Sequence, residues 1–491
     1  MIDRSAPVAV VGAGTMGAGI AQVAAVAGHP VILYDAIEGV AGQALTAIRD
    51  RVTRLVDKGR LQGPVELRLE VAAGLGELAP ARCVIEAVAE DLAVKQALFA
   101  DLEKIVAPDC VLATNTSSLS PTAIAAGLSH PGRLVGLHFF NPAPVMRLVE
   151  VVSGLATDPA VAAAVTGLAE DWGKQVVQAS ATPGFIVNRV ARPFYAEALR
   201  LAEEQAASPA TIDAVLTRAG GFRMGPFALM DLVGQDVNDA VTRSVWTAFG
   251  YDARFAPSLL QLSMVEAGWL GRKTGRGWFR YGDDAEPTEP EIAPARSAPS
   301  FVTEHGESPL RVLLARSGVE VRAGEGRDGM VELPGGAVLA RCDGRPAIAL
   351  GRPAVVVDRT LDDATAEGIA IAVSDGCPAA ARDEATGLLQ AAGLTVYPID
   401  DAPGLVVART VAMLVNGAVD ALHKGVASTA DIDTAMRLGT NYPLGPLAWG
   451  QRWGPATVAG VLDAMQAWYG EDRYRPSALL RRIAAAGGSL I

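Results

Sequence analysis

The sequence predicts an α/β domain with a mainly parallel sheet, then a helical domain, a smaller α/β lobe and a second helical domain. Three observations support this prediction. Short buried runs alternate with helical stretches over the first 182 residues, which is typical of a sheet covered by helices on both faces. From residue 183 to about 270, apolar residues recur every three or four positions, which indicates amphipathic helices. Parts of that segment recur 220 residues later, which indicates a duplicated domain.

The first domain begins with a strand–turn–helix–strand unit. A buried strand is expected at residues 7–11, a Gly-rich turn at 12–17, an Ala-rich helix that ends near Gly28, and a second strand at 31–35. This length, about 30 residues, is that of a βαβ unit. The rest of the domain is predicted as a charged helix at about 37–62 and buried strands at 83–88, 111–114 and 134–137.

The second half of the chain repeats the first helical segment. Pro183-Gly-Phe-Ile-Val-Asn188-Arg189 returns as Pro403-Gly-Leu-Val-Val-Ala408-Arg409. A stretch with Asp-Asp and several prolines precedes the second α/β lobe and is predicted to be a semi-extended linker. We expect five parts: residues 1–182 as the first α/β domain, 183–282 as the first helical domain, 283–309 as the linker, 310–400 as a reduced α/β lobe and 401–491 as the second helical domain.

Composition and charge exclude several classes of protein. The 491-residue chain is half apolar and carries a net charge of −12 without a run of Lys or Arg, which argues against a nucleic-acid partner. No uninterrupted apolar run approaches the roughly 18 residues of a membrane span, and no signal peptide precedes the first strand. The four cysteines are scattered, so we expect reduced thiols, a cytoplasmic protein and no metal site.

The Gly-rich turn has the frame of a dinucleotide site. Gly12 allows the tight turn, Gly14 lets the backbone approach a pyrophosphate, and Gly17 lets the helix pack on the strand. Asp35 lies 23 residues after Gly12, where its carboxylate can bind a ribose diol and repel a 2′-phosphate. We therefore predict NAD as cofactor; the alternative is a close-packed turn without a ligand. A second Gly-x-Gly-x-x-Gly at 324–329 is predicted to be a plain turn, because the Pro-Gly-Gly after it prevents a helix from starting.

One of the five histidines, His138, ends a buried run at a Phe-Phe-Asn141-Pro turn. Glu150 follows it, and Asn115-Thr-Ser117-Ser precedes it. A histidine with a carboxylate and hydroxyls nearby in the sequence is a candidate general base held in one tautomer. The alternative is a structural histidine at a strand end.

Several long motifs resemble the 3-hydroxyacyl-CoA dehydrogenase family, in that family's order over residues 7–281. They are Gly12-Ala-Gly-Thr-Met-Gly, Asn115-Thr-Ser-Ser-Leu, His138-Phe-Phe-Asn-Pro-Ala-Pro-Val-Met, Leu148-Val-Glu-Val, Thr182-Pro-Gly-Phe-Ile-Val-Asn-Arg and Gly271-Arg-Lys-Thr-Gly-Arg-Gly. The resemblance implies a Rossmann-type domain, an all-α domain like that of 6-phosphogluconate dehydrogenase, and NAD-dependent oxidation of an (S)-3-hydroxyacyl-CoA thioester, a β-oxidation step. The duplicated tail resembles the long bacterial branch that contains the 3-hydroxyadipyl-CoA dehydrogenases of phenylacetate breakdown.

The resemblance also implies catalytic roles. His138 resembles the general base that takes the proton of the substrate 3-hydroxyl, and Glu150 resembles the carboxylate that fixes its tautomer. Ser117 resembles the hydroxyl that binds the reacting oxygen, and Asn188 an amide that positions the substrate. The alternatives are a solvated carboxylate for Glu150, a helix N-cap for Ser117 and an exposed amide for Asn188.

Other positions resemble contacts to NAD or CoA. Glu90, Lys95 and Lys273 match residues that reach the nicotinamide side of NAD. Lys58 matches a lysine that meets the CoA phosphates, in a locally basic helix that suits a polyanion; a solvated helix face is the alternative. Some relatives carry Ser at position 51, where this chain has Arg. The remaining predicted contacts are Arg51 and Arg54 for CoA, and Thr15, Met16, Asn115 and Asn141 for NAD.

The second copy lacks the catalytic residues. Asn188 is replaced by Ala408, and no His-Phe-Phe-Asn segment precedes it, so we expect one active site. In shorter relatives this domain forms the dimer interface, so the copy is expected to supply an internal pseudo-dimer contact or part of an acyl pocket. A homodimer through the helical domains is the alternative to the internal pseudo-dimer.

The resemblance favours 3-hydroxyadipyl-CoA as substrate, with 3-hydroxybutyryl-CoA as the alternative. A terminal carboxylate requires a cation at the end of the acyl pocket, and Arg192 and Arg223 are the candidates. A non-catalytic NAD- or CoA-binding protein is the remaining alternative from a different class.

Overall fold

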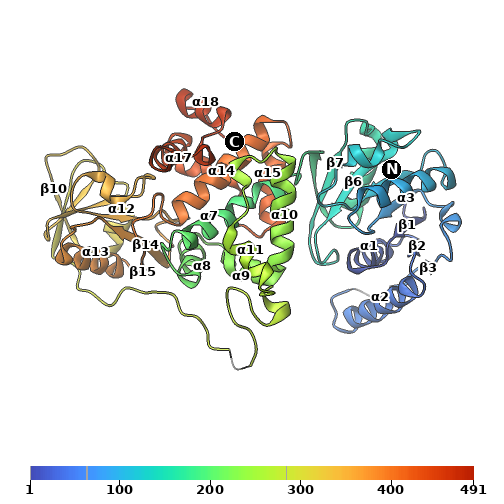
Figure 1. Ribbon diagram of the computed structural model, residues 1–491, viewed down its shortest axis with the longest axis horizontal. Helices are drawn as coiled ribbons and strands as arrows, with labels where there is room; N and C mark the ends of the chain where they lie inside the picture. The colour runs from blue at the N-terminus through green and yellow to red at the C-terminus, as the bar shows by residue number, and fades with distance from the viewer. Residues whose placement is uncertain (1, 62–64, 284) are drawn as a thin grey trace. The chain divides into compact units, whose positions relative to one another are not determined.

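The computed structural model describes residues 2–61, 65–283 and 285–491 (Figure 1). The chain forms two compact units. The first contains Met1–Arg189 and Lys424–Thr440, and the second contains Val190–His423 and Asn441–Ile491. The predicted end of the charged helix, Gln62, and Asp284 of the predicted linker lie outside the described residues. None of the described helices is long and apolar enough to cross a membrane.

An eight-stranded sheet forms the centre of the first unit, in the order β3-β2-β1-β4-β5-β6-β7-β8. All neighbouring strands are parallel except β6 and β7, so the predicted mainly parallel sheet is confirmed. Three of the strands, β3, β7 and β8, are additional to the predicted ones. The strands are β1 Val8–Val11, β2 Val31–Tyr34, β3 Leu69–Val71, β4 Cys83–Glu86, β5 Val111–Thr114, β6 Leu134–Phe139, β7 Leu148–Ser153 and β8 Gln175–Ser180.

Helices cover both faces of this sheet. Val8 and Val10 of β1 pack into a core on one face, and Ala9 and Val11 pack into a separate core on the other. Because both faces are buried, the strand reads as a continuous apolar run. The helix predicted at 37–62 begins later, after Gly39 with its φ of 83°. The helices are α1 Thr15–Val26, α2 Val40–Asp57, α3 Leu92–Ile105, α4 Pro121–Ala125, α5 Pro159–Asp171 and α6 Val187–Val190.

One helix of the second copy, α15 (Thr429–Gly439), belongs to the first unit. It packs against β7 and β8, and the Ser180 N–H donates to the Val426 carbonyl at 2.8 Å. Residues 424–440 of the helical domain predicted at 401–491 therefore group with the first unit. The packing depends on a close approach: a Cβ on Gly439 would lie only 2.8 Å from a side-chain carbon of Leu148.

The second unit contains the rest of both helical copies. Residues 220 positions apart share unusual backbone conformations, such as Gly234 and Gly454 with φ of 107° and 89°. The long helices α7 and α14 pack against each other. The first copy contributes α7 Arg192–Glu203, α8 Pro209–Arg218, α9 Pro226–Val233, α10 Gln235–Ala248, η3 Ala253–Phe255 and α11 Leu259–Glu266. The second contributes α14 Val407–His423, α16 Pro446–Trp453, α17 Pro455–Tyr469, η6 Asp472–Tyr474 and α18 Ala478–Ala486.

A seven-stranded sheet in the same unit has the order β10-β9-β11-β12-β13-β14-β15. Strand β9, Phe301–Glu304, lies inside the linker predicted at 283–309 and pairs with β10 and β11. The linker therefore ends at residue 300, and the lobe begins earlier than expected. The Gly-rich segment 324–329 joins β10 to β11, and no helix starts in this described stretch, as predicted. The other strands are β10 Glu320–Ala323, β11 Val331–Leu333, β12 Ala337–Arg341, β13 Ala354–Val357, β14 Gly368–Val373 and β15 Thr395–Pro398, with helices α12 Arg311–Ser317 and α13 Ala379–Ala391.

Candidate active site

The turn after β1 is shaped to hold a dinucleotide. A Cβ on Gly12 would lie 2.5 Å from the Ala87 carbonyl oxygen, and a Cβ on Gly17 would lie 1.7 Å from that of Gly12, so packing excludes a side chain at both positions. A Cβ on Gly14 meets nothing within 4 Å. Gly14 is also the N-cap of α1, and no described side chain caps this helix end. The first N–H groups of α1 therefore remain for an anion such as a pyrophosphate.

Asp35 lies directly after β2 and contacts this turn. Its Oδ2 accepts a hydrogen bond from the Ala13 N–H at 2.7 Å. A groove of about 630 Å³ lies beside the turn, and its lining includes Gly14, Thr15 and Asn141. The open helix end, the carboxylate and the volume of the groove fit an NAD molecule.

His138 and Glu150 are cross-strand neighbours on β6 and β7. His138 Nδ1 lies 2.7 Å from Glu150 Oε2, and the two residues are 5% and 0% exposed. Because a carboxylate only accepts, Nδ1 carries the proton and Nε2 is left for a substrate proton. The rings of Phe140 and Phe185 flank the imidazole, with centroids 4.5 and 5.8 Å away. This geometry suits a general base whose orientation is fixed by a carboxylate.

Glu150 also holds the start of α6. Its Oε1 accepts from the N–H groups of Ile186 at 3.1 Å and Val187 at 3.0 Å. Asn188, half-buried, is the next residue in the chain. One carboxylate thus joins His138 to the segment that carries Asn188. The complete burial of Glu150 rules out the alternative of a solvated carboxylate.

Glu90 accepts several hydrogen bonds from the segment after β5. Its Oε1 accepts from the backbone N–H groups of Ser117 at 2.9 Å and Ser118 at 3.0 Å, and from the Thr116 hydroxyl at 2.6 Å. Burial alone would raise the pKa of Glu90, but the hydrogen bonds from Thr116 and Ser118 and the charge of Lys95 lower it from 4.5 to about 2. Ser117 Oγ lies 3.5 Å from the same oxygen, at the limit of a hydrogen bond, so this hydroxyl can still donate to a ligand.

Lys95 lies in a buried ionic network, and its predicted contact with NAD stays a prediction. Lys95 is 1% exposed, and its ammonium pairs with Glu86 at 2.6 Å and Glu90 at 3.1 Å. The Thr114 hydroxyl completes the network by donating to Glu86 at 2.7 Å. The motifs do not single out Glu86 or Thr116. A carboxylate inside the buried run of β4 is the signal that points to Glu86, since such a group needs partners.

Three other predicted residues have distinct surroundings. Asn115 Oδ1 accepts from the Phe139 N–H at 2.8 Å, so this amide holds the end of β6. Met16 packs against the core, which leaves its backbone to approach a ligand. Helix α4 begins at Pro121 with Ser120 as its N-cap, so the N-cap alternative for Ser117 is wrong.

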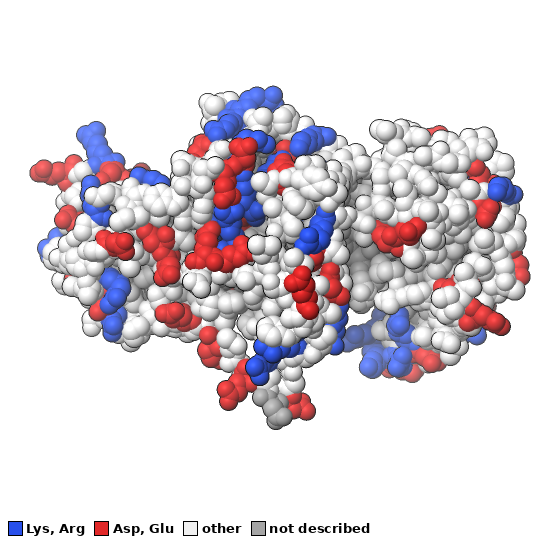
Figure 2. Space-filling model, viewed as in Figure 1, with Lys and Arg blue, Asp and Glu red and all other residues white. Residues whose placement is uncertain are grey.

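Arg51, Arg54 and Lys58 follow one another three and four residues apart on α2 and its C-cap, and therefore share one face. All three are exposed, and Figure 2 shows Lys and Arg atoms gathered over this helix, at the lower right of the view. Arg51 also lines the groove beside Gly14, and its guanidinium donates to Gln22 at 2.9 Å. The basic face suits the phosphates of CoA, and the CoA contacts stay a prediction.

Lys273 belongs to the second unit. Its ammonium pairs there with Asp236 at 2.6 Å. The role of Lys273 toward NAD therefore stays a prediction.

The second lobe carries an acid at the position that corresponds to His138. Asp358 follows β13, 220 residues after His138, and Ala370 on β14 corresponds to Glu150. Burial raises the pKa of Asp358 to about 6, against the lowering effect of backbone hydrogen bonds. Those bonds come from the N–H groups of Val406, Val407 and Ala408. A buried carboxylate thus replaces the histidine–carboxylate pair.

Three family models match the chain. The NAD-binding domain of 3-hydroxyacyl-CoA dehydrogenase matches residues 7–182. The C-terminal domain of that enzyme matches residues 184–281 and again 404–489, which confirms the duplication. The reduced Rossmann-fold domain of 3-hydroxybutyryl-CoA dehydrogenase matches residues 339–403.

Whole-chain relatives show the same affiliation. The 3-hydroxyadipyl-CoA dehydrogenase of Escherichia coli (strain K12) is 47% identical over 485 residues, which covers 97% of this chain and 97% of the relative. A crystal structure of 3-hydroxybutyryl-CoA dehydrogenase from Escherichia coli K12 has a TM-score of 0.90 at 46% identity and covers 98% of this chain and 99% of that chain. The probable 3-hydroxybutyryl-CoA dehydrogenase of Bacillus subtilis is 42% identical over 276 residues, covering 55% of this chain and 96% of the relative. With these matches, the chain belongs to the 3-hydroxyacyl-CoA dehydrogenase family of NAD-dependent oxidoreductases.

Proposed function

We propose that this protein oxidises (S)-3-hydroxyacyl-CoA thioesters to 3-oxoacyl-CoA with NAD, and that 3-hydroxyadipyl-CoA is its main substrate. The observation that carries the reaction class is the buried pair of His138 and Glu150, 2.7 Å apart, in the unit that also holds the dinucleotide turn. The adipyl substrate is supported by the 47% identity over nearly the whole chain to a 3-hydroxyadipyl-CoA dehydrogenase, and the sequence branch connects it to phenylacetate breakdown.

His138 moves the proton in this proposal. Its Nε2 accepts the proton of the substrate 3-hydroxyl, and Glu150 stabilises the imidazolium that forms. NAD, when bound, accepts the hydride that leaves C3. In the reverse direction the same imidazolium returns the proton to the carbonyl oxygen.

Ser117 and Asn188 orient the substrate in the same proposal. The Ser117 hydroxyl donates to the reacting oxygen, and Glu90 holds the Ser117 segment through backbone hydrogen bonds. Asn188 supplies an amide next to the residues that Glu150 anchors. Both segments are held in place by hydrogen bonds to a carboxylate, so binding needs little rearrangement.

The substrate class is tested with a panel of CoA thioesters. NADH absorbance with acetoacetyl-CoA first checks for catalysis; lack of turnover would favour a non-catalytic NAD- or CoA-binding protein. The ratio of kcat/KM for 3-hydroxyadipyl-CoA to that for 3-hydroxybutyryl-CoA then identifies the main substrate. A ratio below one would favour 3-hydroxybutyryl-CoA, the substrate in the names of the Bacillus subtilis relative and the solved Escherichia coli structure.

The same proposal includes a contact between α7 and α14 that takes the place of a dimer interface within one chain. Their packing is supported by ion pairs between the copies, from Arg200 to Glu471 and from Arg254 to Asp420. A cytoplasmic location is supported by the four cysteines, all of them free. Light scattering of the full chain distinguishes a monomer with this internal contact from a homodimer.

A further inference from the structure

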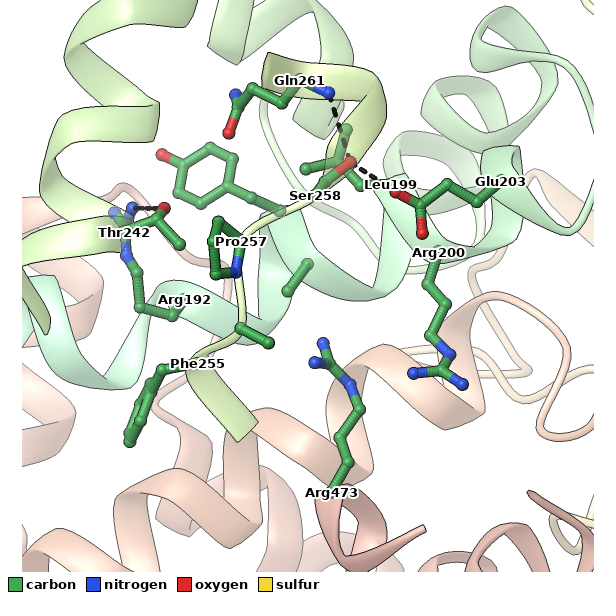
Figure 3. Close-up of a pocket in the computed structure, with 13 residues that line it drawn as sticks. Arg192, Leu199, Arg200, Glu203, Thr242, Phe255, Pro257, Ser258, Gln261 and Arg473 are labelled. Carbon is green, nitrogen blue, oxygen red and sulfur yellow. Dashed lines mark hydrogen bonds between the residues drawn. The ribbon is translucent and has the colours of Figure 1, made fainter. Parts of the chain in front are cut away.

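A cavity of about 100 Å³ in the second unit contains a buried cation, Arg192 (Figure 3). Its walls come from α7, from α10, from the segment between η3 and α11, and from η6 of the second copy. Both copies of the helical domain therefore contribute to it. None of the residues proposed for proton transfer or substrate orientation lines this cavity, so its charge needs a separate explanation.

Arg192 is 5% exposed and makes few polar contacts. Its Nη1 donates to the Thr242 hydroxyl at 3.2 Å, and its Cζ lies 4.9 Å from the centroid of the Tyr195 ring. Its Nε is buried without a hydrogen-bond partner. Among the described residues, no carboxylate pairs with Arg192. A buried guanidinium without an anion is costly, because the hydration that it loses is not replaced.

The two other guanidinium groups of the cavity are neutralised. Arg200 donates to Glu471 at 2.8 Å and to Glu204 at 3.2 Å. Arg473 donates twice to Glu197, at 3.0 and 3.1 Å. Arg192 is therefore the cation of this cavity that still needs an anion.

The fold itself does not require a cation at this position. The residue 220 positions later on α14 is Ala412, which is 0% exposed. The two copies otherwise share their helices and turns. A charged residue buried in one copy and an alanine buried in the other indicate that Arg192 serves a ligand of the first copy.

We propose that Arg192 binds the carboxylate of an aliphatic acid in this cavity. The planar guanidinium matches a carboxylate bidentately. The volume exceeds the roughly 10–15 Å³ that one water needs on the same measure, so a carboxylate with part of its stem fits. Leu199, Phe255 and Pro257 supply apolar walls (Figure 3), which suit methylene groups better than a phosphate. Exposed Glu203 on the rim disfavours a polyanion.

Two sources supply this chemistry: the terminal carboxylate of a 3-hydroxyadipyl thioester, or a free dicarboxylate. The first source rests on the proposed function, and the second does not. Both are tested on the full chain with Arg192→Gln, which removes the charge, and Arg192→Lys, which keeps it. Arg482→Gln is the matched control, because Arg482 is exposed and outside the cavity lining.

The first measurement is the thermal shift of the protein with adipate, with 1,6-hexanediol as the uncharged probe of equal length. Adipate should raise the melting temperature of the wild type and of Arg482→Gln, hexanediol should not, and Arg192→Gln should lose the shift. The second measurement is kcat/KM. If the thioester tail is the source, Arg192→Gln loses about tenfold to hundredfold with 3-hydroxyadipyl-CoA, as for a lost charged hydrogen bond, and stays within about threefold with 3-hydroxybutyryl-CoA.

Loss of the adipate shift with an unchanged kcat/KM ratio would assign the cavity to a free dicarboxylate and still support the carboxylate site. If folded Arg192→Gln keeps both the wild-type adipate shift and the wild-type kcat/KM ratio, the carboxylate site is overturned. If Arg192→Gln does not fold, the absence of an adipate shift in the wild type would overturn the carboxylate site. A wild type that prefers 3-hydroxybutyryl-CoA contradicts the proposed substrate, whereas the adipate measurement still tests Arg192.

Discussion

Asp358 occupies, in the second lobe, the position that His138 occupies in the first sheet. His138 lies near the end of β6 and Asp358 lies directly after β13, 220 positions apart, and each of these strands pairs antiparallel with the next strand along the chain. In the first unit the carboxylate of Glu150 binds the N–H of Val187, and in the second Asp358 binds that of Val407. The anchor between sheet and helix is thus present in both copies, whereas the proton-accepting imidazole is present in one.

Restoring the missing amide in the second copy should not restore activity. Ala408→Asn places an amide 220 residues after Asn188, but its neighbour is Asp358 and not a histidine. We expect no gain in kcat and a lower melting temperature, because Ala408 is 0% exposed and a buried amide needs partners. Asn188→Ala is the comparison and should lose about tenfold or more in kcat/KM, as for one lost polar contact to a charged group. A measurable increase in turnover for Ala408→Asn would contradict a purely structural second copy.

Removing the proposed base should abolish turnover and spare NAD binding. His138→Gln keeps a polar side chain beside Glu150 but cannot accept the substrate proton, so kcat should fall at least about 100-fold. NAD affinity, measured by calorimetry, should change little, because the turn at Gly14 is untouched. His130→Gln, at an exposed histidine, is the control and should behave as wild type. Near-normal turnover of His138→Gln would rule out the mechanism.

Local features of the fold are readable from the sequence, and long-range ones are not. The turn around Gly12 and the strand before Asp35 depend on neighbours within one βαβ unit, and both were predictable. The contact of His138 with Glu150 depends on the antiparallel pairing of β6 and β7, which no local sequence pattern indicates. The burial of Lys95 on α3 depends on its ion pair with Glu86 of β4, a contact that the local sequence around Lys95 does not indicate.

The acid stability of the protein should depend on Glu90. Its pKa is lowered to about 2 in the folded chain, so its ionised form stabilises the fold above pH 4.5, and this contribution is lost as the pH falls through 2. Glu90→Gln should cost about 1–2 kcal/mol at pH 7, a value reduced because the side chain is 36% exposed. The difference in melting temperature from wild type should shrink below pH 4.5. Asp101→Asn, at an exposed pair with Lys104, should show no such pH dependence; equal behaviour of the two variants would contradict the role of Glu90.

The basic face of α2 should act on the nucleotide part of the substrate alone. Lys58→Ala removes an exposed positive charge and should raise the KM for acetoacetyl-CoA several-fold at low ionic strength, with a smaller effect as salt screens the charge. The N-acetylcysteamine thioester of acetoacetate lacks the CoA phosphates, so its KM should not change in this variant. Lys104→Ala, at a lysine that is 73% exposed and outside this face, controls for net charge. Equal KM changes for both thioesters would mean that Lys58 acts on the fold and not on CoA. The face of Arg51, Arg54 and Lys58 would then be an ordinary solvated helix surface.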